Sequence, residues 1–195
     1  MRRTFIVIMA FSLMLVSAAP AFARGGPPPG VKPGGDTIAE IVSSAADDDE
    51  PEFTLLLAAL EYTGLTGVFA GGGQYTVFAP TDEAFTELVV AADLDPDVLE
   101  NEGPFAAIDD LLGEGTVAKV LLYHVTEGRR ATNSVLPRNG ERTIPTLLGP
   151  TFSVDRDASI TAVGNTAKIV TPNVSASNGV IHVIDTVILP IDLGL

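Results

Sequence analysis

The sequence predicts an α+β domain in which several helices flank a small antiparallel β-sandwich. Two observations lead to this fold class. From residue 37 to residue 125, apolar residues recur at spacings of three and four, the period of a helix that buries one face. From residue 139 onwards, short β-rich runs alternate with turn-forming pairs such as Asn139-Gly140 and Asn178-Gly179. Helices first and strands later favour this arrangement over alternating βαβ units.

The first residues have the features of an export signal rather than of a folded element. Arg2 and Arg3 give a positive start, residues 5–19 are apolar, and Ala21-Phe22-Ala23 has the small-x-small pattern of a cleavage site. A Pro/Gly-rich stretch follows, which is typical of a flexible tether. No later stretch is long and apolar enough to span a membrane. We therefore expect a signal peptide (residues 1–23), a tether (24–36) and a single domain (37–192), with no integral membrane segment in the mature chain.

Charge is distributed unevenly along the chain. Without Arg2 and Arg3 the chain carries 9 basic and 25 acidic residues, a net charge of −16. Residues 36–114 contain nineteen acidic residues and no Lys or Arg, whereas the chain from Lys119 onwards has seven basic and six acidic residues. One interpretation is a solvated acidic face that keeps the protein soluble; the other is attraction to cationic partners. A basic stripe with interleaved aromatic residues is absent from the sequence, so we expect no nucleic-acid partner.

Four amphipathic helices are predicted by the spacing of apolar residues. The second helix, over residues 53–60, is expected to end at Thr63-Gly64, because glycine favours a helix C-terminus. The acidic run at residues 47–51 is expected to end the first helix, over residues 37–44, and to cap the second. The four apolar stripes fall in residues 37–44, 53–60, 108–112 and 117–124.

A further boundary between a strand and a helix is predicted at residues 76–85. Val77 and Phe78 are strong strand formers, and Pro80 ends the strand because it has no N–H to donate. Thr81 is a good N-cap for the following helix, and Asp82 lies in its first turn, where the helix dipole favours negative charge. Asp82 is therefore expected to stabilise a helix start and to reach a neighbouring loop.

Short strands are predicted in the second half of the chain. Phe152 and Val154 alternate with a polar residue, and residues 168–171 are rich in strand formers. Residues 180–184 are apolar at nearly every position, which is typical of a central strand buried on both faces. Together with the intervening turns, these runs predict four to six antiparallel strands.

Three stretches of the sequence resemble the signatures of the fasciclin domain family, an extracellular adhesion module. They occur in the expected order and extend the resemblance over residues 36–192. The resemblance implies one complete, wedge-shaped domain, a β-sandwich flanked by helices, in a secreted protein. The absence of cysteine from an exported chain favours a bacterial source. The matching residues are Thr76, Phe78, Ala79, Pro80, Thr81, Asp82 and Phe85 in the first stretch, Leu122, Tyr123, His124 and Val125 in the second, and Asn178, Gly179, His182 and Asp185 in the third.

The tyrosine–histidine stretch has two interpretations. The resemblance implies a partner-binding role for Leu122, Tyr123, His124 and Val125, because this motif has been linked to integrin binding in animal fasciclin domains. The position of His124 on the apolar side of its helix favours a partly buried histidine bonded to a backbone carbonyl. The hydroxyl of Tyr123 is then expected to reach a neighbouring loop.

His182 lies in the strand that is predicted to be buried on both faces, so its imidazole needs a hydrogen-bond partner. The resemblance places this strand close to the first signature. We therefore expect a bond to Thr81 or Asp82. The alternative is a histidine that lines a pocket with free nitrogens, which would favour a ligand or metal role.

Catalytic, cofactor-binding and metal-binding residues are not predicted. The sequence has no cysteine nucleophile, no Gly-x-Ser-x-Gly elbow and no glycine-rich phosphate loop. The stretch 93–97 is similar to a calcium loop, but Val98 and Pro104 stand where glycine and glutamate are needed. Two histidines without cysteine do not favour a transition-metal site.

The sequence as a whole favours a secreted, non-enzymatic adhesion or binding module. Its expected partners are extracellular proteins or polysaccharides of the cell surface or matrix. One alternative is a carbohydrate or small-ligand carrier that uses the wedge between helices and sandwich. Another is a carboxylate-dependent hydrolase, because acidic pairs are abundant. The sequence leaves the oligomeric state open.

Overall fold

The computed structural model describes residues 35–48, 51–70, 73–92, 99 and 104–191. The expected signal peptide, nearly all of the expected tether and the calcium-like stretch at residues 93–97 lie outside the described residues. Within the described residues, no helix is long and apolar enough to cross a bilayer.

Seven helices and seven strands make up the described part of the chain. The helices are α1 (Ile38–Ala46), α2 (Thr54–Thr63), α3 (Thr66–Ala70), α4 (Asp82–Ala91), α5 (Pro104–Leu112), α6 (Thr116–Tyr123) and α7 (Thr132–Val135). The strands are β1 (Tyr75–Pro80), β2 (Val125–Glu127), β3 (Glu141–Pro145), β4 (Thr151–Asp155), β5 (Ser159–Thr161), β6 (Thr166–Ala176) and β7 (Gly179–Ile184). This is an α+β fold, as the sequence predicts. The short helices α3 and α7 were not predicted.

All seven strands belong to one sheet with the order β2-β1-β7-β6-β5-β4-β3. Strands β1 and β7 pair in parallel, with Phe78 opposite His182, and every other neighbouring pair is antiparallel. The prediction of antiparallel pairing alone is therefore wrong for this pair. A parallel pair needs a long connection between its strands, and residues 81–178, from α4 to β6, lie between β1 and β7.

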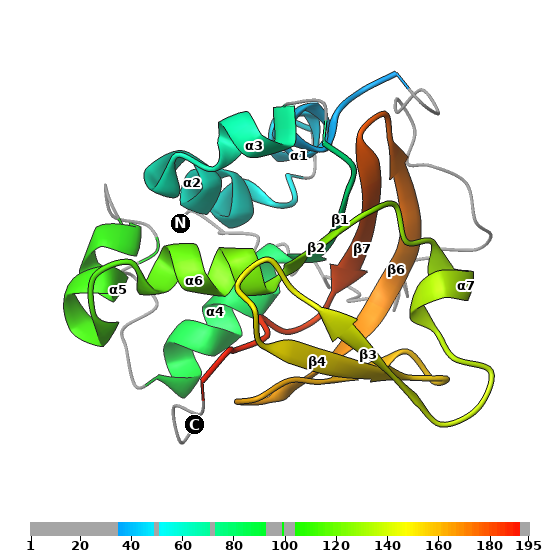
Figure 1. The fold of residues 1–195 in the computed structure, drawn as a ribbon. Helices are drawn as coiled ribbons and strands as arrows, with labels where there is room; N and C mark the ends of the chain where they lie inside the picture. The colour runs from blue at the N-terminus through cyan, green and yellow to red at the C-terminus, as the bar shows by residue number, and fades with distance from the viewer. Residues whose placement is uncertain (1–34, 49–50, 71–72, 93–98, 100–103, 192–195) are drawn as a thin grey trace, which may run out of the picture.

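Strand β6 lets the single sheet fold back on itself. It pairs with β5 through its first residues and with β7 along most of its length, and its register shifts twice between Ile169 and Val174. Asn173 has a left-handed backbone (φ 64°) within this irregular stretch. Such irregularities bend a strand and increase its twist. Figure 1 shows β3 and β4 crossing in front of the lower part of β6 as a result.

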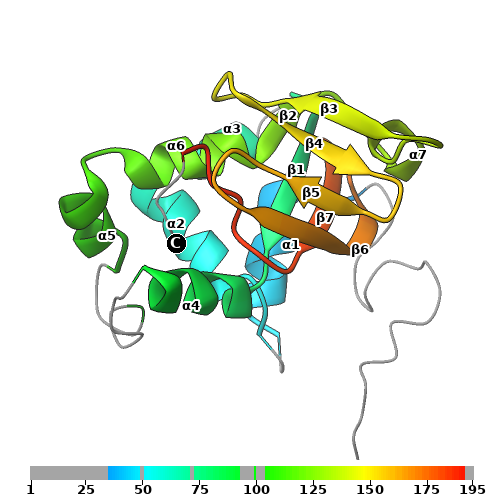
Figure 2. The same cartoon turned by 90° about the horizontal axis from the view of Figure 1, so that it is seen from below.

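Two apolar cores lie on the two sides of the sheet. The first lies between the sheet and the helices, and contains Ile38 of α1, Leu60 of α2, Phe85 of α4 and Ile181 of β7. The second lies inside the folded sheet, where side chains of β1, β6 and β7 meet those of β3, β4 and β5: Phe78, Ile144, Phe152, Val154, Ile160, Ile169 and Ile184. Figures 1 and 2 show helices α1 to α6 gathered on one side, with α7 at the opposite end from α5.

Helix α4 begins as the sequence predicts, because the Thr81 hydroxyl accepts a hydrogen bond from the Ala84 N–H at 3.2 Å. Helix α2 begins differently. Its N-cap position is Phe53, which has a left-handed backbone (φ 66°) and no side-chain cap. The run 47–51 was predicted to end the first helix and to cap the second: Asp47 is indeed the C-cap of α1, but the N–H groups of Thr54 and Leu55 are not capped by the described residues of this run. The cap comes from Asp82, a residue of another helix.

Candidate functional site

The three signature stretches meet at one edge of the sheet, in the neighbouring strands β2, β1 and β7. Strand β1 carries the first stretch and lies between β2, which follows the tyrosine–histidine pair, and β7, which carries the third. Val77 of β1 is opposite Val125 of β2 on one side and opposite Ile181 of β7 on the other. Residues that are far apart in the sequence therefore form one continuous structural unit.

Asp82 joins the start of α4 to the start of α2. Its carboxylate accepts hydrogen bonds from the Thr54 N–H (3.0 Å), the Thr54 hydroxyl (2.6 Å) and the Leu55 N–H (2.9 Å). In return, the Glu52 carboxylate accepts a hydrogen bond from the Asp82 N–H at 3.3 Å. Each helix thus receives at its N-terminus a carboxylate from the other helix or its flank, which satisfies free N–H groups and complements the helix dipole.

Asn178 and Gly179 fix the start of β7 against the helices. The Asn178 side chain accepts a hydrogen bond from the Ile38 N–H (2.8 Å) and donates one to the Phe69 carbonyl (2.5 Å), so it connects α1 to α3. A Cβ atom on Gly179 would lie 2.0 Å from the Tyr75 carbonyl oxygen. Glycine is therefore required here by the close approach of the two backbones.

Tyr123 lies in the core of the folded sheet and is fully buried. Its hydroxyl donates a hydrogen bond to the Thr151 carbonyl at 3.0 Å and accepts one from the Val163 N–H at 3.4 Å. Burial raises the pKa of this phenol. The ring contacts Phe152 edge-on, with a centroid distance of 5.8 Å. The tyrosine thus joins the end of α6 to the start of β4 and to the segment after β5. This agrees with the expectation that its hydroxyl reaches a neighbouring loop.

His124 is also buried, and both of its ring nitrogens are used. Nδ1 lies 2.7 Å from the Val120 carbonyl oxygen, and Nε2 accepts a hydrogen bond from the Ile188 N–H at 3.0 Å. Because an amide N–H can only donate, Nε2 must be unprotonated and Nδ1 carries the proton. Burial lowers the pKa of His124 to about 4. The neutral ring therefore fastens the segment after β7 to the end of α6.

This geometry bears directly on the partner-binding role implied for residues 122–125. Tyr123, His124 and Val125 are at most 3% exposed, and Leu122 is only partly exposed. In the folded domain the side chains of Tyr123, His124 and Val125 are therefore not on the surface, whereas that of Leu122 is so in part. The structure instead supports the second interpretation of the stretch, in which His124 bonds a backbone carbonyl and holds the fold together.

His182 is buried and bonded, but its partner differs from the prediction. Nε2 donates to the Arg130 carbonyl at 2.9 Å, and Nδ1 accepts a long hydrogen bond from the Asn173 N–H at 3.4 Å. The expected bond to Thr81 or Asp82 is wrong, because the parallel register places His182 opposite Phe78, short of the strand end. The ring stacks on Phe78 instead, with centroids 5.4 Å apart. Burial lowers the pKa of His182.

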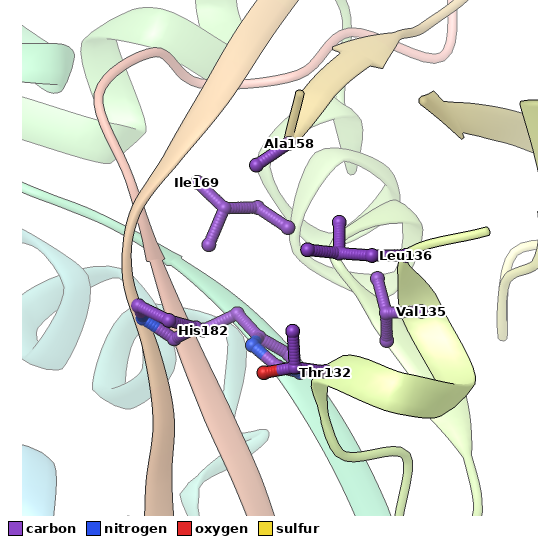
Figure 3. A pocket seen from close by; sticks show the side chains of 7 residues that line it. Thr132, Val135, Leu136, Ala158, Ile169 and His182 are labelled. Atoms are coloured by element: carbon purple, nitrogen blue, oxygen red, sulfur yellow. The ribbon is translucent and has the colours of Figure 1, made fainter. Parts of the chain in front are cut away.

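A small cavity lies beside His182. Figure 3 shows the imidazole approaching it from β7, with Ile169 and Ala158 on one side and Thr132, Val135 and Leu136 of the α7 region on the other. Its volume is about 30 Å³, which is room for little more than a water molecule. This histidine lines a pocket, but its nitrogens are occupied by backbone groups, so the arrangement does not favour a ligand role.

A second cavity lies among the helices and is almost entirely apolar. It has a volume of about 50 Å³ and is lined by Phe85, Phe105, Val117, Leu121, Val187 and Ile191, among others. Ligand pockets usually measure 300–1,000 Å³. Neither cavity therefore offers the space that a sugar or a drug-sized molecule needs.

Asp109 is a buried carboxylate that sequence reasoning missed. It is 7% exposed and accepts hydrogen bonds from the Gly115 N–H (3.1 Å), the Val117 N–H (2.9 Å) and the Tyr62 hydroxyl (3.2 Å). It therefore caps α6 from α5, just as Asp82 caps α2 from α4. The only local signal was a carboxylate that precedes a glycine turn and a new helix. Within the described residues, no group of three or more His, Asp or Glu side chains is arranged to hold a metal ion.

Comparison with known proteins agrees with this architecture. Residues 51–190 match the model of the fasciclin domain. The chain is 34% identical over 160 residues to "Protein sll1483" of Synechocystis sp., covering 80% of this chain and 76% of that protein. It is 32% identical over 153 residues to "Immunogenic protein MPB70" of Mycobacterium bovis, covering 75% of this chain and 68% of the relative.

A solved structure shares the fold at low sequence identity. It is a FAS1 domain pair from the insect cell adhesion molecule Fasciclin I, with a TM-score of 0.61 and 17% identity. The match covers 79% of this chain and 51% of that one, so the chain spans about half of the domain pair. On the family match and the two relatives together, this chain belongs to the fasciclin domain family.

Proposed function

We propose that the protein is an exported, non-enzymatic binding module that recognises extracellular components through its surface. The observation that carries this proposal is the use of the signature residues. All of their polar side chains make hydrogen bonds inside the domain: Thr76, Thr81, Asp82, Tyr123, His124, Asn178, His182 and Asp185. A catalytic group must be free to meet a substrate, so these residues are better suited to building a rigid scaffold.

The family and the structural neighbour support an adhesion role for this scaffold. The fold is shared with a domain pair of a cell adhesion molecule. Recognition on such a domain takes place by surface complementarity, with exposed side chains as the contacts. We therefore place the partner on the exposed surface of the domain, where Leu122 is the one member of the stretch 122–125 whose side chain is partly exposed.

Export is the second part of the proposal. Residues 1–23 have the composition of a cleavable signal, and residues 24–36 have that of a flexible tether. Fractionation of the producing cells provides the test. We expect a shortened chain, without residues 1–23, in the extracellular medium, in the periplasm or at the cell surface. An intact chain that stays in the membrane and keeps residues 5–19 would contradict export.

A capture experiment tests the binding role. Purified protein immobilised through its C-terminus is incubated with cell-surface and matrix extracts, which are split into protein and polysaccharide fractions. We expect one fraction to be retained by the folded protein and released by excess free protein. Heat-unfolded protein at the same density is the control. Retention of neither fraction, or hydrolysis of a matrix polymer by the pure protein, would contradict the proposal.

A further inference from the structure

Four arginines lie close together in the sequence around α7, although the protein as a whole is strongly acidic. They are Arg129, Arg130, Arg138 and Arg142, and we call the segment 129–142 the arginine surface. It lies at the opposite end of the molecule from α5 in both views (Figures 1 and 2). The only acidic residue within it is Glu141, whereas residues 36–114 carry nineteen acidic residues and no Lys or Arg. Along the sequence, positive charge is therefore concentrated around α7, with Glu127 before the segment and Asp155 opposite Glu141 as neighbouring acidic residues.

These guanidinium groups form no ion pair with the carboxylates of the described residues. Arg156 forms an ion pair with Asp157 at 3.6 Å, but within the described residues no carboxylate lies within 4.0 Å of the four arginines of this surface. In a chain with 25 acidic residues, ion pairing would have been readily available. The positive charge at this end is left for an external anion.

Three of the four arginines are held in place by the backbone. Arg129 donates to the Ala176 carbonyl (2.7 Å) and to the Ser175 hydroxyl (2.5 Å), Arg130 donates to the Glu127 carbonyl (3.2 Å), and Arg142 donates to the Ser134 carbonyl (2.5 Å). A guanidinium has five N–H donors, so each keeps several for a ligand. Fixing such side chains in advance lowers the entropy cost of binding.

The rest of the arginine surface is polar. Its exposed side chains include Asn133, Asn139 and Thr143 next to it, and none of the large exposed apolar side chains of the described residues lies there. Protein interfaces usually contain aromatic or aliphatic anchors at their centre. Amide and hydroxyl groups beside fixed arginines suit a polar polymer that carries carboxylate or sulfate groups and hydroxyls.

We propose that the arginine surface binds an anionic extracellular polysaccharide, one that carries carboxylate or sulfate groups. The inference rests on the proposed function and names its partner class. The overall negative charge does not prevent such binding, because charges beyond about 8 Å are largely screened at physiological ionic strength. The acidic helical end instead orients the protein, so that α7 faces the polymer and the helices face away.

Binding of the purified protein to defined polymers tests this inference. The probes are heparin for sulfate, alginate for carboxylate, neutral dextran as the uncharged control and duplex DNA as a different polyanion. We expect heparin or alginate to bind with an affinity that falls as salt rises, and dextran and DNA to bind at least tenfold more weakly.

Two charge-reversal variants locate the surface. Arg138 is exposed, and its side chain makes no hydrogen bond to the described residues, so Arg138→Glu should leave the melting temperature unchanged. It should weaken polymer binding about tenfold, because one charge-assisted contact is replaced by repulsion. Lys119→Glu makes the same charge change at an exposed position of α6 and should weaken binding less than twofold.

Each remaining outcome overturns the inference in a different way. Equal effects of Arg138→Glu and Lys119→Glu would show that net charge and not this surface is recognised. If DNA bound as tightly as heparin or alginate, the surface would recognise polyanions in general and not a polysaccharide. If the protein associated with itself in a salt-sensitive way and Arg138→Glu abolished this association, the arginine surface would bind the acidic end of a second copy and not a polysaccharide. If no anionic polymer binds while the capture experiment still retains an extracellular protein, the inference fails and the proposed function stands.

Discussion

The Asp82 carboxylate accepts hydrogen bonds from both the backbone N–H and the hydroxyl of Thr54, at 3.0 and 2.6 Å. One residue therefore begins α4 in its own chain segment and caps α2, which starts 28 positions earlier. The domain uses the same device at α6, where the carboxylate of Asp109 on α5 supplies the cap. Each capped helix is therefore fixed at its N-terminus to another helix by polar bonds as well as by apolar packing.

The first prediction follows from this relationship. Asp82→Asn removes the negative charge and places an amide NH₂ against N–H donors of α2, so we expect a loss of about 1–2 kcal/mol in the free energy of unfolding. For a protein of this size, that corresponds to a fall of about 3–6 °C in melting temperature. Differential scanning calorimetry measures the change.

Glu83→Gln is the matched control, because Glu83 is exposed in the same helical turn and its carboxylate accepts no hydrogen bond from the described residues. It should change the melting temperature by less than about 1 °C. An Asp82→Asn variant that keeps full stability but loses a ligand would show that the aspartate has a binding role instead.

Much of the helical layer could be predicted from the sequence, because the helix period and the cap at Thr81 depend on neighbouring residues only. The cap of α2 could not be predicted in the same way. The acidic run at residues 47–51 offers local caps in the sequence, but the N-cap position is Phe53, and the N–H groups of Thr54 and Leu55 donate to Asp82. The choice depends on how α2 and α4 pack, which local spacing does not encode.

In the strand-rich half, the burial of a residue could be predicted from the sequence but its hydrogen-bond partner could not. Burial of His182 on a central strand was predicted from alternation and is confirmed at 0% exposure. Its partner was not predicted, since the Arg130 carbonyl is a backbone group that any residue type would supply. The parallel register of β1 and β7 decided which carbonyl lies within reach. The same holds for residues 122–125, where the motif is visible in the sequence but its burial is set by the folded sheet.

The second prediction concerns His182. His182→Phe keeps a stacked ring next to Phe78 but leaves the Arg130 carbonyl without its donor, which should cost about 1–3 kcal/mol of stability. The effect should be local as well. Hydrogen exchange is expected to speed up first at α7, because the Arg130 carbonyl lies just before that helix.

Val183→Ala is the control for His182→Phe, because it is a core substitution on the same strand whose side chain belongs to the helix-facing core. It should lower stability without selectively exposing α7. Uniform exchange changes in both variants would indicate that His182 contributes packing alone.

The third prediction is a pH dependence caused by His124. Its pKa is lowered to about 4 in the folded protein, against an ordinary value of 6.5. The unfolded chain therefore binds a proton below pH 6.5 while the folded chain does not, so stability falls as pH decreases from about 6.5 to about 4. The difference in pKa corresponds to about 3 kcal/mol over this window. His182 has a pKa lowered by burial and contributes in the same direction.

Urea unfolding at several pH values between 7 and 4 measures this dependence. Carboxylates titrate over the lower part of the window in the wild type and in any variant, so a difference between two proteins isolates the histidine. In His124→Gln the residue can still pair with Val120 and Ile188 but does not titrate. Its stability should fall less steeply with decreasing pH than that of the wild type. Parallel pH profiles would contradict a neutral, buried His124.

The fourth prediction tests the close contact between β1 and β7. A Cβ atom at Gly179 would lie 2.0 Å from the Tyr75 carbonyl oxygen and 2.8 Å from Cδ1 of Ile38. The carbonyl belongs to the backbone and cannot rotate away, so Gly179→Ala must push β7 from β1 or from α1. We expect a loss of about 3 kcal/mol in the free energy of unfolding, with a fall of about 6–12 °C in melting temperature.

Gly67→Ala is the control, since a Cβ on Gly67 in α3 has no neighbour within 4 Å and alanine favours helix. It should be neutral or slightly stabilising. Equal melting temperatures for the two variants would mean that β1 and β7 do not approach as closely as described, and the parallel pairing that joins the first and last strands would have to be revised.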